Sequence, residues 1–240
     1  MEAFIPSAGL GTRLKPLTDS IPKALVEING TPLLEIIIRR LSNAGVNHFV
    51  INTHHFSEKI HEFLELKKYF NASIDISDEK NLLLDTGGGF KKASAFLKEE
   101  NFLIHNVDIL SGISIKSFMD FHIQNGFTAT LAVQERESSR YFLFDEEKLL
   151  CGWENIKTGE KKITRTPAGG LRRFAFSGIH TVNRKIFRFF PPQEVFSIID
   201  FYLSIAGDYP IAYFDHSETD FIDLGKIENL KEAEKKFINF

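Results

Sequence analysis

Apolar positions in the first 134 residues follow two spacings that alternate along the chain. The first spacing consists of short apolar runs rich in β-branched and aromatic side chains, which is typical of buried strands. These runs predict strands at residues 2–7, 48–54, 72–77, 101–109 and 127–134.

The longer segments between these strands carry apolar residues at helical spacing. Pro32 stands near the first turn of one segment, Gly45 ends it, and Ser57 is suited to cap the next. Alternating strands and helices need right-handed crossovers, so we expect a doubly wound α/β fold with a mostly parallel (mixed), Rossmann-like sheet covered on both faces. The predicted helices are residues 31–46, 56–70, 87–100 and 114–126.

The pattern changes at about residue 135. Residues 135–182 hold short strand-like pieces and turn signals without helical spacing, which predicts a small antiparallel insertion on one side of the sheet. No repeat or linker interrupts the chain, so we expect a single domain over residues 1–240. The remaining predicted elements are helices at 184–190, 194–207 and 227–238 and short strands at 210–216 and 220–224.

Composition narrows the classes of function. Hydrophobic residues make up 43% and charged residues 25%, and the formal charge is −3, which gives no bulk electrostatic reason to bind nucleic acid or an anionic membrane. The most apolar segment, residues 32–41, contains three charged residues and is too short to span a membrane. A single cysteine, Cys151, excludes an internal disulfide, and the start MEAFIPSAG lacks the pattern of a signal peptide. We therefore expect a cytoplasmic protein.

Glycines and cationic residues gather directly after the first predicted strand, in the stretch IPSAGLGTRLKPLTDSIPKALVEING. Gly9 and Gly11 allow a ligand to approach the backbone closely, while Arg13 and Lys23 supply positive charge suited to phosphate. The third glycine of the dinucleotide fingerprint and the G-K-[ST] of a Walker A loop are both missing. The residues alone leave two interpretations open, a phosphate-binding loop and a tight loop with solvated cations.

The predicted topology gives this loop a partner. In parallel α/β sheets, ligands bind outside the carboxyl ends of the strands. Residues 7–13 follow the first strand, and Asp108 follows the apolar part of the fourth. If both strands are central and parallel, the loop and Asp108 share one crevice.

Four motifs give the chain a family resemblance. AGLGTRLKPLT, IPKAL and NGTPLLEIIIRRL resemble the amino-terminal signature of the sugar-1-phosphate nucleotidyltransferases, and LLLDTGGGF resembles a segment of small bacterial members of that family. The resemblance implies the nucleotide-diphospho-sugar transferase type of Rossmann-like fold, with a nucleoside triphosphate bound by the first two motifs and its base and ribose by the fourth. The implied nucleotide-binding residues are Ala8, Gly9, Gly11, Thr12, Arg13, Lys23, Thr86 and Gly87.

Three further segments extend the resemblance along the chain. LIHNVDIL resembles the strand that ends in the family's metal-binding aspartate, and DFIDLGKIENLKEAEK resembles its closing motif. Asp108 and Asp223 are thereby implied as ligands of Mg²⁺, which needs only one or two carboxylates when phosphates complete its shell. RRFAFSGIHTV resembles the strand that lines the sugar pocket, which points to Ser177 and Gly178.

The chain departs from the family pattern at several positions. Val107 replaces the usual glycine before the metal aspartate, and Lys226 replaces a usual threonine. The E-K-P sugar-phosphate motif of larger members is missing, and Lys161 and Lys162 lie nearby without a clear alignment. We also expect no left-handed β-helix domain after residue 240.

The implied reaction is NTP + sugar-1-phosphate → NDP-sugar + pyrophosphate. The acceptor phosphate attacks the α-phosphorus in line, so catalysis consists of positioning and charge stabilisation. The catalytic residues implied are Arg13, on the leaving pyrophosphate, Lys23, at the reacting phosphates, and Asp108, which holds Mg²⁺ together with Asp223. The attacking phosphate is already ionised, so none of the eight histidines is assigned a catalytic role.

Several alternatives stay open. The subgroup favours a uridylyl or guanylyl donor, and related enzymes also use CTP with alcohol phosphates such as phosphocholine. A catalytically silent nucleotide-sugar sensor would keep the fold but lose the metal carboxylates or the lysine, whereas Arg13, Lys23, Asp108 and Asp223 are all present. An NAD-dependent dehydrogenase is disfavoured, because the third glycine of the dinucleotide fingerprint is missing. The phenylalanines of residues 174–202 are consistent with a homodimer interface or with a buried helix pair.

Overall fold

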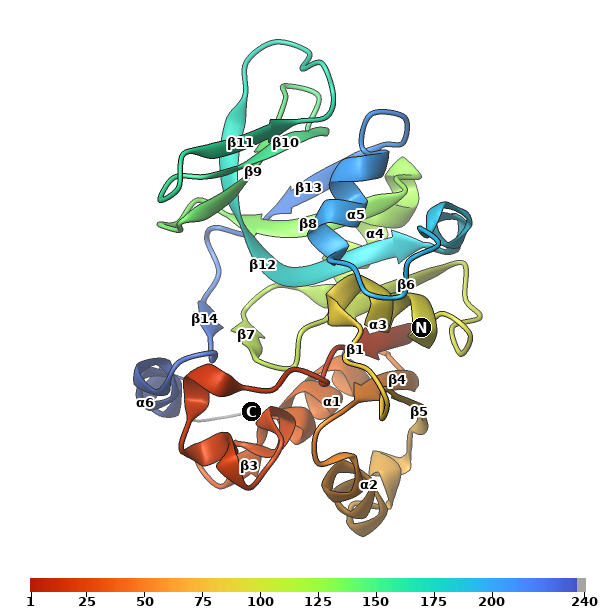
Figure 1. Cartoon of the computed structure of the whole chain (residues 1–240), viewed down its shortest axis with the longest axis vertical. Helices are drawn as coiled ribbons and strands as arrows, with labels where there is room; N and C mark the ends of the chain where they lie inside the picture. The colour runs from red at the N-terminus through yellow and green to blue at the C-terminus, as the bar shows by residue number, and fades with distance from the viewer. Residues whose placement is uncertain (237–240) are drawn as a thin grey trace.

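The computed structural model describes residues 1–236. Its main sheet runs in the order β5-β4-β1-β6-β12, with β8 and β13 completing the far side (Figure 1). All of these strands are parallel except β12, which is antiparallel to both β6 and β8. The strands are β1 (Glu2–Ile5), β4 (His48–Thr53), β5 (Ser73–Asp78), β6 (Asn101–His105), β8 (Ala129–Gln134), β12 (Arg172–Asn183) and β13 (Ile211–Asp215).

Helices cover both faces of the sheet, as the alternation of strands and helices predicts. Side chains of neighbouring strand residues point to opposite faces, so Ala3 and Ile5 join one core and Phe4 joins the other. The first core packs against α1 (Leu33–Asn43), α2 (Ser57–Leu66), α4 (Ile115–Asn125) and α6 (Ile227–Lys236). The second packs against α3 (Asp85–Ala93) and α5 (Ile198–Ile205).

The expected antiparallel insertion is confirmed. Strands β9 (Arg140–Phe144), β10 (Leu150–Asn155) and β11 (Glu160–Ile163) pair antiparallel in sequence, and β9 pairs with the first part of β12. Two small sheets complete the fold, β2 (Glu27–Ile28) with β3 (Thr31–Pro32), and β7 (Ile109–Ser111) with β14 (Phe221–Asp223).

The structure corrects several predicted boundaries. Residues Arg184–Phe189 form a 3-10 helix instead of an α-helix. Helix α5 begins at Ile198, not at residue 194, because the Ser197 hydroxyl accepts the Ile199 N–H and caps it there. Helix α3 begins earlier than predicted, at Asp85, and ends at Ala93. The last two residues of the predicted closing helix lie outside the described residues.

The phenylalanine-rich segment belongs to the second core. The rings of Phe190, Phe196 and Phe201 lie 5.3 to 6.3 Å apart by centroid, and Phe190 also meets Phe90 of α3 at 5.2 Å. Intramolecular packing therefore accounts for these rings, and a homodimer remains a prediction.

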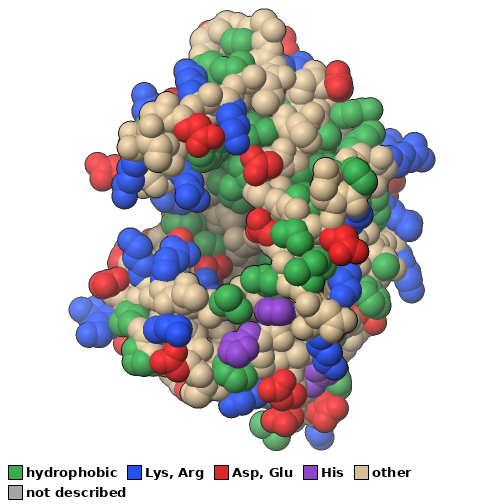
Figure 2. Space-filling model, viewed as in Figure 1, with side chains coloured by type: hydrophobic (Ala, Val, Ile, Leu, Met, Phe, Trp, Pro, Cys, Tyr) green, Lys and Arg blue, Asp and Glu red, His purple; other side chains and the backbone are tan. Residues whose placement is uncertain are grey.

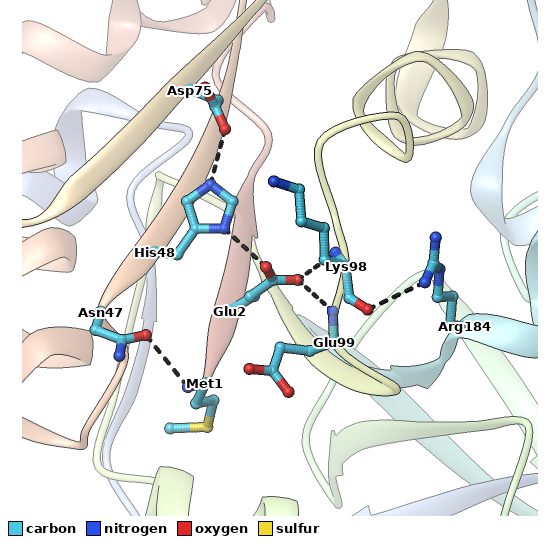
Figure 3. A network of polar contacts seen from close by, with 8 residues as sticks. All are labelled: Met1, Glu2, Asn47, His48, Asp75, Lys98, Glu99 and Arg184. Carbon is cyan, nitrogen blue, oxygen red and sulfur yellow. Dashed lines mark hydrogen bonds and ion pairs between the residues drawn. The ribbon is translucent and has the colours of Figure 1, made fainter.

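A polar network joins the amino-terminal ends of the parallel strands (Figure 3). One carboxylate oxygen of the buried Glu2 contacts Nδ1 of His48 at 2.9 Å, and the other accepts the N–H groups of Lys98 and Glu99 at 2.7 and 2.9 Å. Burial raises the pKa of Glu2, but the hydrogen bonds from Glu99, His48 and Lys98 outweigh burial and lower it. The network anchors β1 from the end opposite its glycine-rich loop.

Candidate functional site

A cavity of about 440 Å³ opens where β1, β4, β5 and β6 end. It brings the loop after β1 and the residues after β6 into one crevice, as the topology predicts. Its lining residues are Pro6, Ser7, Ala8, Gly9, Lys23, Asn52, Glu79, Leu83, Asp85, Thr86, Asn106, Val107, Asp108 and Val195.

The two glycines of the loop differ in their surroundings. Gly11 has a φ of +63°, and a Cβ added there would lie 2.9 Å from Cγ2 of Thr18, whose hydroxyl also donates to the Gly11 carbonyl at 2.9 Å. Gly11 therefore meets a conformational demand of the loop itself. Gly9 has no neighbouring atom within 4 Å of an added Cβ, so its missing side chain serves no internal contact. Its position on the cavity wall leaves the backbone open to a ligand.

Two residues that the sequence analysis missed fix the start of this loop. Oδ1 of Asn52 accepts the N–H groups of Ser7 and Ala8 at 2.6 and 3.3 Å, and its Nδ2 donates to Oε1 of Glu79 at 2.6 Å. The second oxygen of Glu79 accepts the Leu84 N–H at 3.0 Å. One buried pair thus joins the glycine-rich loop to the segment before α3. The available signal was a polar Asn inside the apolar run of residues 48–54.

Lys23 and Asp108 contact each other on the cavity wall. The ammonium group donates to Oδ2 of Asp108, and the two side chains are 13% and 15% exposed. A partly buried cation and carboxylate need each other's charge when no ligand supplies it. The Asp108 carboxylate therefore already faces a cation.

Asp223 reaches the same region by a different route. Strand β14 pairs with β7 so that Asp223 lies opposite Ile109, and the N–H of Leu224 donates to the carbonyl of Asp108 at 2.8 Å. A Cβ added at Gly225 would lie 2.7 Å from Nη2 of Arg13 and 2.9 Å from Oδ1 of Asp223, so these two side chains meet at Gly225. Arg13, Asp108 and Asp223 therefore lie in one neighbourhood.

The donor set suits a magnesium ion shared with phosphates. Asp108 directly precedes β7, and Asp223 ends β14, the strand that pairs with β7. Within residues 1–236 no group of three or more His, Cys, Asp or Glu side chains is placed to hold a metal. Mg²⁺ commonly keeps waters and substrate phosphates beside one or two carboxylates, so the residues present fit this ion.

The TGGG segment has a structural role besides its place on the cavity. The N–H groups of Gly87 and Gly88 donate to the carbonyl of Phe196 at 2.9 and 3.2 Å, and a Cβ at Gly88 would overlap the carbonyl oxygen of Glu194. These glycines allow close packing, and the N–H groups of Gly87 and Gly88 are already hydrogen-bonded within the protein. The Thr86 hydroxyl accepts the Ile198 N–H at 3.0 Å.

Ser177 and Gly178 lie at an irregularity in the pairing of β12 with β8. Ser177 is fully buried and contacts Nε2 of His216 at 2.8 Å, so its hydroxyl faces the interior. Gly178 has a φ of +69°, and an added Cβ would lie 2.8 Å from Nδ2 of Asn106. Their role as sugar contacts stays a prediction.

Val107 and Lys226 depart from the family pattern close to Asp108 and Asp223 in sequence, and the structure locates both. Val107 is 3% exposed and packs in the first core, although part of it borders the cavity. Lys226 is exposed just before α6. Cys151 is buried, and burial together with Asp145 raises the pKa of its thiol to about 11, which excludes a reactive thiolate at neutral pH.

The structure has no helix, among the described residues, that is long and apolar enough to cross a membrane.

Figure 2 shows the surface hollowed between the β9–β12 strands and the segment after β1, with Lys and Arg side chains on both walls.

Known proteins resemble this chain in sequence. The chain is 42% identical over 108 residues to the N-acetylmuramate alpha-1-phosphate uridylyltransferase of Caulobacter vibrioides, a match covering 44% of this chain and 45% of that protein. It is 27% identical over 243 residues to the D-glycero-alpha-D-manno-heptose 1-phosphate guanylyltransferase of Aneurinibacillus thermoaerophilus, covering all of both chains.

A solved structure confirms the fold. The crystal structure of HddC from Yersinia pseudotuberculosis superposes with a TM-score of 0.80 at 24% identity, covering 98% of this chain and 99% of that chain. The sequence of residues 2–239 matches the nucleotidyl transferase family. The chain therefore belongs to the nucleotidyl transferase family.

Proposed function

We propose that this protein condenses a nucleoside triphosphate with a sugar 1-phosphate to give an NDP-sugar and pyrophosphate. The observation that carries the proposal is the convergence of the open backbone at Gly9, the cation Lys23 and the carboxylate Asp108 on one cavity. Such a site suits two anionic substrates, because their mutual repulsion must be offset by fixed positive charge and donor groups.

Each residue has a task in this proposal. The loop from Ala8 to Thr12 binds the triphosphate through backbone N–H groups. Lys23 leaves Asp108 when the phosphates arrive and neutralises them at the reacting centre. Arg13, beside Asp223, binds the leaving pyrophosphate, and its fork-shaped guanidinium suits two phosphate oxygens.

Asp108 and Asp223 hold Mg²⁺, which when bound supplies Lewis-acid stabilisation of charge on the phosphates. Release of Asp108 from Lys23 frees its carboxylate for that ion. The acceptor phosphate needs no general base, because it is ionised at neutral pH. Thr86 and the loop before α3 border the base and ribose.

The relatives narrow the substrates that we propose. Those matched include a uridylyltransferase for N-acetylmuramate 1-phosphate and guanylyltransferases for heptose and mannose 1-phosphates. We therefore place UTP and GTP first as donors, and a cytoplasmic location fits the buried free thiol of Cys151.

The test is pyrophosphate release with Mg²⁺ from ATP, CTP, GTP, UTP and dTTP, each paired with a panel of sugar 1-phosphates and with phosphocholine. We expect release with one donor and one sugar phosphate, and none when Mg²⁺ is chelated. Release with CTP and phosphocholine alone would reassign the acceptor. Nucleotide binding without release over the whole panel would indicate a silent sensor instead.

A further inference from the structure

Arg136 is a half-buried cation just after β8. Its Nη2 donates to the carbonyl of Phe176 at 2.9 Å, and its guanidinium lies over the ring of Phe221, 4.4 Å from the centroid. These contacts fix the guanidinium between β12 and β14.

This position lies close to Asp223. Phe221 and Asp223 are two residues apart in β14, so their side chains share a face of that strand. Burial lowers the pKa of Arg136, and the Asp223 carboxylate opposes this. Phe176, whose carbonyl holds the guanidinium, directly precedes Ser177 and Gly178.

Most of the hydrogen-bonding capacity of Arg136 is unused. Within residues 1–236, Nη2 makes the only hydrogen bond of this guanidinium, no carboxylate lies within ion-pair distance, and the buried Nε has no partner. A guanidinium carries five N–H donors. Nη1 and the second Nη2 proton make no hydrogen bond among the described residues, and charged N–H groups of this kind suit an anionic ligand.

Two arginines near Arg136 already have carboxylate partners, whereas Arg136 has none in the described part of the chain. Arg136 borders a cavity of about 470 Å³. Arg172 on its wall is paired with Glu135 at 2.5 Å, and Arg173 with Glu154 at 3.5 Å. The cavity is lined by Glu135, Arg136, Glu137, Tyr141, Arg172 and Arg173.

The two lysines that stand near the missing E-K-P motif lie elsewhere. Lys161 and Lys162 are exposed on β11, which is separated from β12 by β10 and β9. Lys162 is also engaged with Asp200 at 3.3 Å and Glu160 at 3.5 Å. Arg136 is therefore better placed than either lysine to meet an acceptor.

We propose that Arg136 binds an anionic oxygen group of the acceptor sugar phosphate, on the β12–β14 side of Asp223. The inference rests on the proposed function and adds to it a residue that selects the acceptor. Two groups have this chemistry, the 1-phosphate that every acceptor carries and a carboxylate present only in acidic sugars. The closeness of Arg136 to Asp223 favours the 1-phosphate.

The test compares wild type with Arg136→Met, which keeps an apolar stem over Phe221, and Arg136→Lys, which keeps the charge. Binding of mannose 1-phosphate and N-acetylmuramate 1-phosphate is measured by calorimetry with Mg²⁺ and a non-hydrolysable triphosphate, and KM values are measured wherever turnover occurs. Arg172→Met is the matched control, because that guanidinium already has a carboxylate partner. Melting temperatures establish that each variant folds.

We expect Arg136→Met to weaken acceptor binding about 10- to 100-fold while the KM for the triphosphate stays within about twofold. Arg136→Lys recovers part of the loss, and Arg172→Met changes acceptor binding less than about threefold. An equal loss for both sugars assigns the 1-phosphate, and a loss confined to N-acetylmuramate 1-phosphate assigns the carboxylate.

Unchanged acceptor binding in folded Arg136→Met would overturn the inference and leave the proposed function intact. Acceptor binding that depends on Arg136 without any turnover would uphold the anion site and contradict the proposed reaction. If wild type binds no acceptor at all, both ideas fail.

Discussion

The ammonium group of Lys23 contacts the carboxylate of Asp108, which lies 85 residues further along the chain. Each side chain is mostly buried, and each supplies the opposite charge that the other needs. The pair therefore joins the cation that we propose for phosphate binding to the carboxylate that we propose for metal binding.

Asp108→Asn is expected to lower the rate of Mg²⁺-dependent pyrophosphate release by about 10³-fold or more, because several kcal/mol of charge stabilisation in the transition state are lost. The fold should persist, since asparagine keeps the shape and a hydrogen-bond acceptor for Lys23. Activity is measured with the best substrate pair, and unfolding by circular dichroism. Asp120→Asn, at a position on α4 that pairs with Lys116, is the control. Full turnover in Asp108→Asn would contradict the metal assignment.

Asn52→Asp should weaken triphosphate binding and stability together. The new carboxylate would lie where Nδ2 of Asn52 now donates to Glu79, so two buried carboxylates would face each other and one donor would be lost. We expect a loss of about 1–3 kcal/mol in the free energy of unfolding and a raised KM for the triphosphate.

The measurement is chemical denaturation at neutral pH together with steady-state kinetics. Glu79→Gln placed in the Asn52→Asp background relieves the repulsion and should restore part of the stability. Equal stability of Asn52→Asp and wild type would show that this pair does not order the loop.

Substitution by alanine should lower stability at Gly88 and weaken triphosphate binding at Gly9. At Gly88 the added methyl group overlaps the carbonyl oxygen of Glu194, so we expect the free energy of unfolding to fall by about 1–3 kcal/mol or more. At Gly9 the methyl group meets open space in the protein, so stability should hold while the KM for the triphosphate rises.

Thermal melts and nucleotide titrations separate the two effects. Gly170→Ala serves as the control, because its added Cβ would make only an ordinary contact of 3.6 Å with Glu146. Unaltered triphosphate binding in Gly9→Ala would contradict the assignment of this backbone as a phosphate cradle.

Acid should destabilise the protein partly through His122. This buried residue contacts Thr130 Oγ1 at 2.8 Å and Asn101 Oδ1 at 3.2 Å, and burial lowers its pKa from 6.5 to about 4. Between these values the unfolded chain binds one proton more than the folded chain at this residue. The stability that His122 contributes is therefore complete above pH 6.5 and falls by about 1.4 kcal/mol per unit as pH drops toward 4.

Denaturation curves at several pH values between 4.5 and 7.5 measure this slope. His122→Gln should reduce the slope of unfolding free energy against pH by the contribution of one histidine. His55→Gln, at an exposed position, is the control and should leave that slope unchanged. A slope that is unaltered in His122→Gln would mean that this side chain does not take up a proton on unfolding.

The periodicity of apolar residues predicted the α/β architecture, because the spacings of strand and helix are properties of the local chain. The glycines and cations after β1 and the position of Asp108 could likewise be predicted to meet, since the carboxyl ends of parallel strands share one edge. Local signals also placed the insertion, where strand-like pieces replace helical spacing in residues 135–182.

Contacts between distant segments decided the rest. Asp223 lies beside Asp108 because β14 pairs with β7, a register that side-chain periodicity in so short a strand does not specify. The glycines of the TGGG segment serve packing against Glu194 and Phe196, which a glycine-rich helix start alone does not reveal. Asn52 holds the loop because folding brings the N–H groups of Ser7 and Ala8 to its side chain. Arg136 is held in place by the Phe176 carbonyl and the Phe221 ring, which lie far from it in sequence. The sequence alone determined the alternating elements and the gathering of glycines and cations directly after the first strand, because both depend on neighbouring residues. Only the tertiary structure decided which side chains complete the site, because hydrogen bonds and strand pairing across the sheet set those distances.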